Sequence, residues 1–419
     1  MLLPFSALFL GVALMMLGAG LQGSLLGVRG VIEGFDTGVL GVVMSGYFAG
    51  FLAGSAIVPR FVGRVGHIRV FAALASLASA TVLAHAAFPE PWLWGLMRLL
   101  TGFSYAGLYI VVESWLNDMS DNRSRGKVLG TYMVIQLGAL SLSQVLLMLG
   151  DPASAGPFML IAVLVSLAVM PVCLSASRTP DFSAPEAMSI LALYRLSPLG
   201  TVGMALTGMS NGAVFGFSAV YARQAGFSIP EISAFVALVF GIGMLLQWPV
   251  GRLSDRFDRR SVIAVVTFVT AGIALLAAIL PGTGATIPVL IAVGAIAGGL
   301  SVPLYSLFNT HVNDMVEPRQ RIAASGRLIF LNGIGAIAGP NIAAQLMDAT
   351  GPGGYFTTLV ILHVAIGLMT IWRMLQRPAP PGGETVDFVA MPVRGTAMTA
   401  QLVPEPADQP DDGRKDEQA

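Results

Sequence analysis

The feature that most constrains this chain is a series of long apolar stretches that recurs along almost its whole length. A helix that crosses a bilayer needs about 20 mostly apolar residues. Only 11% of the 419 residues are charged, against about 25% in a typical soluble domain. We therefore predict an all-α integral membrane protein with twelve transmembrane helices. These lie near residues 5–28, 37–59, 67–88, 93–116, 127–149, 156–175, 198–221, 231–250, 261–281, 286–311, 323–347 and 353–374.

The same composition excludes several classes of function. The 23 basic residues balance 23 acidic ones, so no basic surface favours nucleic acid. A single cysteine, Cys173, and four histidines offer neither a disulfide framework nor a multi-ligand metal site. The sequence shows no pairing of a nucleophile with a base. We therefore expect no enzyme activity and no cofactor.

Basic side chains gather in every second connection between the predicted helices. They are Arg60, Arg64, Arg69, Arg123, Arg125, Lys127, Arg178, Arg195, Arg252, Arg256, Arg259, Arg260, Arg319, Arg321, Arg327, Arg373 and Arg377. The other connections carry only Arg29 and Arg223. Because Lys and Arg accumulate in the cytoplasmic loops of membrane proteins, we predict that both termini are cytoplasmic.

The predicted helices fall into two sets of six. Residues 176–197 are the longest connection and are predicted to form a central cytoplasmic loop. They separate an N-terminal six-helix bundle, residues 1–175, from a C-terminal bundle, residues 198–375. Residues 376–419 are rich in proline and charge, so we expect a disordered cytoplasmic tail.

The two halves also repeat each other. Shifting residues 102–130 by 196 positions places them on residues 298–326, and nine of the 29 pairs are identical. The identities include the tripeptide Asn-Asp-Met at 117–119 and 313–315, which chance similarity between apolar helices would hardly supply. Duplicated, pseudo-symmetric halves are typical of secondary transporters, whose halves move around a site near the bilayer midplane.

Two motifs connect the chain to a known family. The loop Gly251-Arg252-Leu253-Ser254-Asp255-Arg256-Phe257-Asp258-Arg259-Arg260 resembles G-x-L-x-D-R-x-G-R-R of the major facilitator superfamily, with Asp258 where Gly is usual. The segment Arg98-Leu99-Leu100-Thr101-Gly102 resembles the motif that opens the family's fourth helix. The chain is most similar to the YcaD-like branch, through residues 25–29, 45–50, 111–114 and 247–253.

Candidate cavity residues are buried polar or aromatic groups, several of them symmetry-related between the halves. They are Gln22, Tyr47, Arg98, Tyr109, Gln136, Asn211, Tyr305 and Asn332. The resemblance implies that the first, fourth, seventh and tenth helices line the cavity. Arg98 either contacts an anionic solute or takes part in a proton relay, or it has a purely structural role. The amides either line the cavity or bind helices together.

Candidate gate residues lie near the predicted cytoplasmic ends of the helices. They are Arg60, Arg64, Glu113, Asp255, Arg256 and Arg260. Gly63 stands where the motif has an acid in its first-half counterpart. We hypothesise that Glu113 supplies the missing acid to Arg60 or Arg64. The alternative is that the arginines only set topology and contact lipid headgroups.

These features predict a secondary transporter of a small organic solute, which works by alternating access in a bacterial inner membrane. Efflux is favoured over metabolite or sugar uptake, because the cavity candidates are mainly neutral amides and tyrosines. Protons are a candidate coupling ion, and a monomer is expected. A non-transporting sensor on a transporter scaffold is the alternative from a different class.

Overall fold

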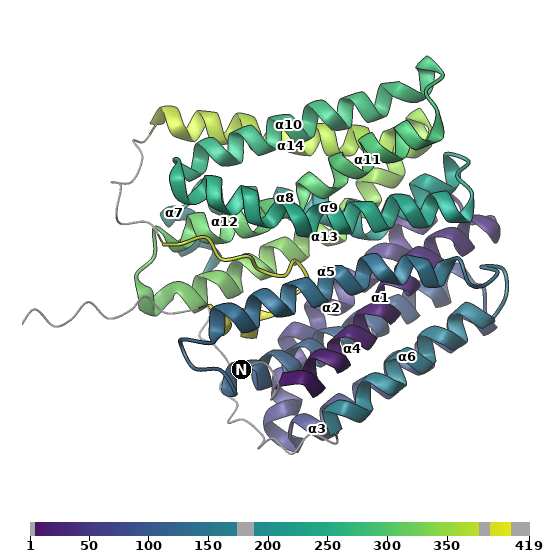
Figure 1. The fold of residues 1–419 in the computed structure, drawn as a ribbon, viewed down its shortest axis with the longest axis horizontal. Helices are drawn as coiled ribbons and strands as arrows, with labels where there is room; N and C mark the ends of the chain where they lie inside the picture. The colour runs from purple at the N-terminus through teal and green to yellow at the C-terminus, as the bar shows by residue number, and fades with distance from the viewer. Residues whose placement is uncertain (1–4, 174–187, 377–385, 404–419) are drawn as a thin grey trace, which may run out of the picture.

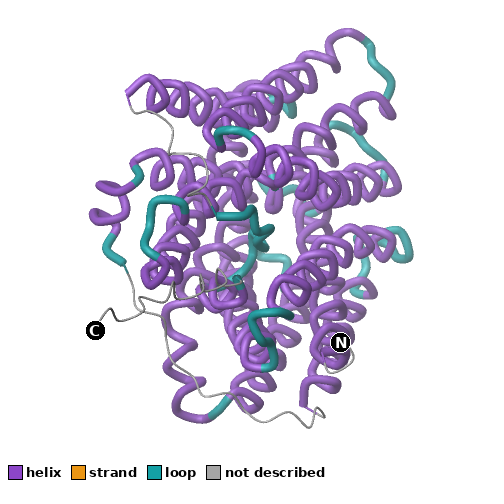
Figure 2. Tube along the Cα trace, turned by 60° about the vertical axis from the view of Figure 1, so that its left-hand side comes forward, coloured by secondary structure: helices purple, strands orange, loops and turns teal. Residues whose placement is uncertain are grey.

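The computed structural model describes residues 5–173, 188–376 and 386–403, which form helices and loops without a strand (Figure 2). The first half contains α1 (Ser6–Ile32), α2 (Thr37–Val65), α3 (His67–Ala87), α4 (Pro91–Asp118), α5 (Arg125–Leu147) and α6 (Gly156–Cys173). The second half contains α8 (Pro198–Gln224), α9 (Ile229–Arg256), α10 (Arg259–Ile279), α11 (Ile287–Ser301), α12 (Pro303–Asn313), α13 (Arg321–Thr350) and α14 (Gly354–Gln376). Short helices are α7 (Ile190–Leu196), η2 (Leu280–Thr283), η3 (Pro318–Gln320) and η4 (Ala397–Leu402).

Each predicted span corresponds to one helix in this structure, except residues 286–311, which form α11 and α12. Eleven spans among the described residues are long and apolar enough to cross a membrane, with α11 and α12 counted as one. The twelfth, α8, reaches the same standard only together with α7, from which it is bent by 117°. Helix α8 is less apolar because it buries many Gly, Ser, Thr and Asn residues. The predicted fold class is confirmed.

Local sequence explains where several helices begin. At the start of α9, the backbone N–H of Ser228 donates to the carboxylate of Glu231 over 2.8 Å, which forms part of a capping box. Helix α10 begins after Asp258, whose carboxylate accepts from the backbone N–H of Arg260 over 3.0 Å. Helix α12 begins at Pro303, where the missing N–H costs no hydrogen bond.

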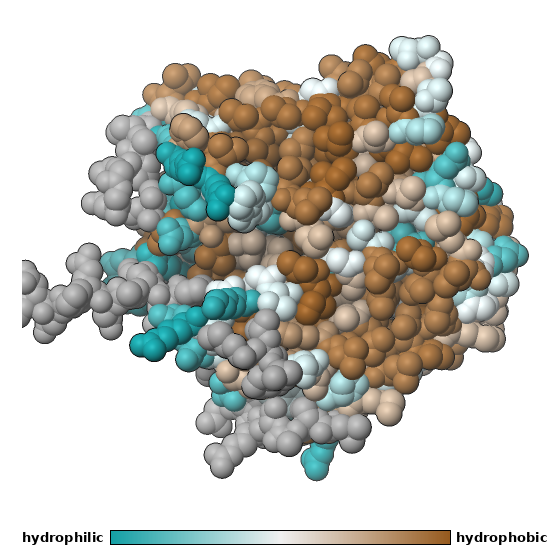
Figure 3. Space-filling model, in the orientation of Figure 1, coloured by the Kyte–Doolittle hydropathy of each residue, from teal (hydrophilic) through white to brown (hydrophobic). Residues whose placement is uncertain are grey.

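The two halves lie side by side, with the first half below the second in Figure 1. Large apolar side chains face outward, including Leu142, Val163, Leu245, Ile361 and Leu368. On the visible face hydrophobic residues form a broad band, and hydrophilic residues lie toward its two ends (Figure 3). This distribution suits a bilayer, whose hydrocarbon core accepts apolar side chains between two polar interfaces.

Glycines bring α2 and α4 into backbone contact. A Cβ atom at Gly102 would overlap the carbonyl oxygen of Tyr47, and one at Gly50 would overlap the carbonyl oxygen of Leu99. Glycines of α8 and α13 make a similar close contact in the second half. Small residues let membrane helices approach closely, so van der Waals packing can hold them together.

We expect Gly102→Ala to lower the stability of the protein by about 1–3 kcal/mol, because α2 and α4 must move apart to admit the methyl group. Gly95 lies on the same helix, and a Cβ there meets no described atom within 4 Å. Gly95→Ala is therefore the matched control and should leave stability unchanged or slightly higher. Thermal unfolding in detergent measures both, and equal melting temperatures would contradict this packing.

Part of the predicted tail is ordered. Residues 386–403 run as an extended segment into η4 and lie between the two halves, drawn in yellow in Figure 1. The prediction of a wholly disordered tail is therefore wrong for this segment. The run Val-Asp-Phe-Val-Ala-Met-Pro-Val at 386–393 supplies apolar surface. The prediction did not take this run into account, because the tail as a whole is rich in proline and charge. Residues 377–385 and 404–419 lie outside the described residues, as do 174–187 of the predicted central loop.

Candidate functional site

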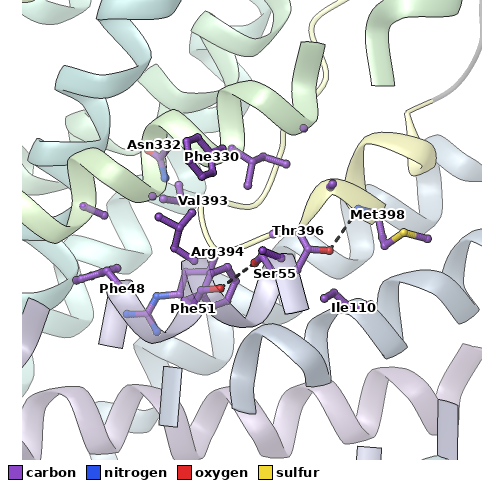
Figure 4. Close-up of a pocket in the computed structure, with 18 of the residues that line it drawn as sticks. Phe48, Phe51, Ser55, Ile110, Phe330, Asn332, Val393, Arg394, Thr396 and Met398 are labelled. Carbon is purple, nitrogen blue, oxygen red and sulfur yellow. Dashed lines mark hydrogen bonds between the residues drawn. The ribbon is translucent and has the colours of Figure 1, made fainter. Parts of the chain in front are cut away.

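A cavity of about 550 Å³ lies between the two halves. Its walls come from α2, α4, α8 and α13 and from the segment 386–403. Figure 4 labels lining residues from α2, α4, α13 and this segment. The aromatic lining residues are Tyr47, Phe48, Phe51, Phe215 and Phe330. The polar lining residues include Ser55, Asn211 and Asn332. Such a mixture of apolar walls with few polar groups is typical of sites that bind small organic molecules.

The cavity extends toward the end of the bundle that carries the α2–α3, α4–α5 and α9–α10 connections. We call this the arginine-rich end, defined by Arg60, Arg64, Arg123, Arg252 and Arg256. Arg60 and Arg327 line the cavity there.

At the opposite end the halves are in contact. The hydroxyl of Ser45 on α2 donates to the carbonyl oxygen of Ile337 on α13 over 2.7 Å, and the side-chain amide of Asn341 donates to that hydroxyl over 2.7 Å. The side-chain amide of Gln224 on α8 donates to the hydroxyl of Thr37 over 2.9 Å. These bonds join residues that lie far apart in sequence, so they hold this end closed.

Three predicted cavity residues line the cavity. Asn211 on α8 and Asn332 on α13 are buried, and the amide of Asn211 donates to the side-chain oxygen of Asn332 over 3.3 Å. Tyr47 on α2 lines it as well. The Asn pair thus both lines the cavity and connects two helices, so the two roles considered for such amides coincide at this position.

The other predicted cavity residues are buried but are not among the lining residues. They are Gln22, Arg98, Tyr109, Gln136 and Tyr305. The hydroxyl of Tyr109 lies 2.9 Å from the sulfur of Met16. Gln22 and Gln136 each have a side-chain nitrogen with no hydrogen-bond partner among the described residues.

Arg98 lies directly behind the cavity wall. Its guanidinium carbon is 4.7 Å from the ring centre of Tyr47, which is the geometry of a cation–π contact. No ion pair of Arg98 is present among the described residues, and its Nε has no hydrogen-bond partner there. A buried guanidinium whose Nε lacks a partner among the described residues is a group that an anion or water would satisfy.

Glu113 on α4 is completely buried. Its carboxylate accepts from the hydroxyl of Tyr132 over 3.0 Å and from the backbone N–H of Thr396 over 3.1 Å. These partners differ from the hypothesised ones, since no contact of Glu113 with Arg60 or Arg64 is present among the described residues.

The motif loop forms a charged cluster at the arginine-rich end. The guanidinium of Arg260 pairs with Asp258 over 2.9 Å. Burial acts to raise the pKa of Asp258, but hydrogen bonds from Arg260 hold that pKa below its ordinary value. The carboxylate of Asp255 accepts from the backbone N–H of Phe388 over 2.7 Å, and Arg256 is exposed.

One ion pair in this cluster was not predicted from the sequence. Arg259 lies 2.9 Å from Asp314, and both side chains are at most 4% exposed. Burial raises the pKa of Asp314 to about 6, although the nearby charge of Arg259 acts to lower it. Asp314 belongs to the repeated Asn-Asp-Met tripeptide, so the repeat singled out this acid without identifying its partner.

Within the described residues no group of His, Cys, Asp and Glu side chains could hold a metal ion. The site is instead a closed-ended cavity between two bundles, with charged clusters at one end. A model of the Major Facilitator Superfamily matches residues 200–389.

Relatives extend this match over both halves. An uncharacterized MFS-type transporter YcaD from Salmonella typhimurium is 27% identical over 393 residues, which cover 92% of this chain and 98% of the relative. An uncharacterized MFS-type transporter from Enterobacter sp. (strain 638) is 26% identical over 381 residues, which cover 90% of this chain and 97% of the relative.

Solved structures agree with the fold. The nucleoside transporter NupG has a TM-score of 0.71 at 16% identity, over 89% of this chain and 100% of its own. A bacterial homolog of the human lysosomal transporter Spinster, in an inward-facing and unoccupied conformation, has a TM-score of 0.70 at 15% identity, over 90% of this chain and 99% of its own. The motifs, the repeat and the twelve-helix architecture agree with these matches, so the chain is similar to proteins of the major facilitator superfamily and resembles the YcaD-like transporters among them.

Proposed function

We propose that this protein is a secondary transporter that moves a small organic solute by alternating access, and that the solute binds in the central cavity. One observation carries the proposal. The cavity lies between two pseudo-symmetric bundles that touch at the end opposite the arginines. Rocking of the bundles would open that end and close the arginine-rich end around the same site.

The orientation and direction belong to the same proposal. The positive-inside rule places the arginine-rich end in the cytoplasm of a bacterial cell, with both described ends of the chain on that side. The aromatic and amide lining favours efflux of amphipathic compounds over uptake of a metabolite or sugar. Glu113 and Arg98 are the buried ionisable groups of α4 that proton coupling would use. We propose that the protein acts as a monomer, and as a transporter rather than an enzyme.

The proposal is tested by ligand-dependent thermal stability of the purified protein across a library of metabolites and antimicrobials. A solute at a hundredfold excess over its Kd stabilises by about 2.7 kcal/mol. We call the solutes that stabilise the protein hits. They should no longer stabilise Asn332→Leu, which lacks a lining amide, but should still stabilise Arg64→Ala, in which an exposed side chain is removed. Hits that no lining substitution affects would contradict binding in the cavity.

Arg98→Ala in the same screen separates the two roles of this arginine. Loss of anionic hits would make Arg98 a binding residue, which reaches solute past Tyr47. Anionic hits that still stabilise Arg98→Ala would indicate that Arg98 has a structural role. Flux of a hit into proteoliposomes then distinguishes a transporter from a sensor, which binds solute but moves none.

A further inference from the structure

The segment 386–403, which we call the C-terminal segment, lies between the bundles at the arginine-rich end (Figure 1). It contacts both halves. Six of its residues line the cavity between α2 and α13, namely Val393, Arg394, Gly395, Thr396, Ala397 and Met398. One wall of the cavity is therefore formed by a segment that follows α14 in the chain and that is held against the bundles by contacts with both halves.

The segment is first held by the charged cluster of the second half. The backbone N–H of Val386 donates to Asp314 over 3.0 Å, and its carbonyl oxygen accepts from Arg259 over 2.7 Å. The backbone N–H of Phe388 donates to Asp255 over 2.7 Å. Three charged groups of the motif region therefore bind main-chain atoms of the segment.

Further along, the segment enters the cavity. The backbone N–H of Met391 donates to the hydroxyl of Ser306 on α12 over 3.0 Å. The guanidinium carbon of Arg394 lies 5.4 Å from the ring centre of Tyr47 and 5.0 Å from that of Phe215. These rings belong to different halves, so one cationic side chain contacts aromatic walls on both sides of the cavity.

The segment ends on the first half. The hydroxyl of Thr396 donates to the carboxylate of Glu113 over 2.5 Å, and the backbone N–H of the same residue donates over 3.1 Å. The side-chain amide of Asn117 donates to Gln401 over 3.2 Å. Thr396 is only 1% exposed, so these bonds are shielded from water.

We propose that the C-terminal segment is an inhibitory plug, which occupies the solute cavity and competes with solute for its aromatic walls. The plug binds charged groups of the second half and a buried carboxylate of the first, so the arginine-rich end cannot close while the plug is in place. Because it is covalently attached, its effective concentration near the cavity is of the order of mM. A solute that must displace the plug binds with a lower apparent affinity, which is the intrinsic affinity multiplied by the fraction of protein that is unplugged.

This inference rests on the proposed function only in taking the cavity as the solute path, and its test uses no solute. A Cβ at Gly326 on α13 would lie 3.5 Å from the Cβ of Ala397, in ordinary contact with the plug. Gly326→Cys, in a Cys173→Ser background, is therefore covered by the plug and should react slowly with a soluble maleimide.

Ending the chain at Gln376 should accelerate labelling of Gly326→Cys about tenfold, if the plug is in place nine-tenths of the time. Gly63→Cys is the matched control, because Gly63 lies at the arginine-rich end of α2, is exposed, and meets no described atom within 4 Å. Its labelling rate should not change. A synthetic peptide of residues 386–403 should restore protection to the shortened protein, and the same peptide with Arg394→Ala should restore less.

A second variant covers the case in which the shortened chain does not fold. Arg394→Ala with Thr396→Val in the full chain removes the contacts with Tyr47 and Phe215 and the hydroxyl hydrogen bond to Glu113, and it should also accelerate labelling. Unchanged labelling of Gly326→Cys in this variant would overturn the plug, as would unchanged labelling in a folded shortened chain. Faster labelling in a protein that moves no solute would keep the plug and contradict the transporter instead.

Discussion

Gly41→Leu is expected to reduce solute flux to near the background of empty liposomes. Gly41 lies on α2 at the closed end, where a Cβ would be 2.8 Å from the Cβ of Ala344 and 3.2 Å from the carbonyl oxygen of Pro340 on α13. A leucine side chain cannot fit there while the end is closed, because packed helices do not leave space for it. The bundles would then remain apart at this end, and the cycle would stop.

Flux of a hit from the thermal screen into proteoliposomes measures this effect. The control is Gly38→Leu, one turn earlier on α2, where a Cβ meets only a carboxylate oxygen of Asp348 at 3.4 Å among the described residues. This variant should transport at close to the normal rate. Normal flux through Gly41→Leu would show that closure of this end is not part of the cycle.

Asp314→Ala is expected to lower the stability of the folded protein by about 3–5 kcal/mol, because it leaves the buried Arg259 without its acidic partner. Asp118 is the equivalent acid in the first half and is exposed. Asp118→Ala should therefore change stability by no more than about 0.5 kcal/mol. Thermal unfolding of the two variants in the same detergent measures the difference.

Replacing both partners distinguishes the ion pair from simple loss of packing. Burial raises the pKa of Asp314 to about 6 despite the adjacent arginine, which indicates that desolvation outweighs the attraction. Asp314→Leu combined with Arg259→Met should therefore recover much of the stability lost in Asp314→Ala. A double variant as unstable as the sum of both single variants would contradict this account, since coupled partners are not additive.

The architecture could be predicted from sequence because hydropathy and the repeat act over long stretches. Twelve apolar runs fix twelve helices, and backbone groups in a bilayer must be satisfied within each helix. The division at Pro303 was not predicted, because a single proline in an apolar run does not show whether a helix breaks or only bends.

The candidate site was harder to predict, because it depends on which helix faces meet. The repeat singled out Asn211 and Asn332 as the counterparts of Gln22 and Gln136, but only the structure shows that the two asparagines lie within hydrogen-bond distance of each other. The sequence predicted that Arg98 lies inside the protein but not that it lies behind Tyr47. The spacing of residues along a helix shows which of them share a face, but not which helix packs against that face. Thr396, which donates to Glu113, lies 283 residues away from it, in a segment whose composition indicated disorder.

The central claim is that the two ends of the bundle open in alternation around one cavity. It is tested most directly by spin-label distances across both ends of the full chain in lipid nanodiscs, in a Cys173→Ser background. One pair is Gly63→Cys with Arg252→Cys at the arginine-rich end, where both residues are exposed, and the other is Gly38→Cys with Ala349→Cys at the opposite end. The account predicts two populations at each end, which change in opposite directions when a hit solute is added. A single distance at both ends that solute does not shift, or two ends that widen together, would contradict it.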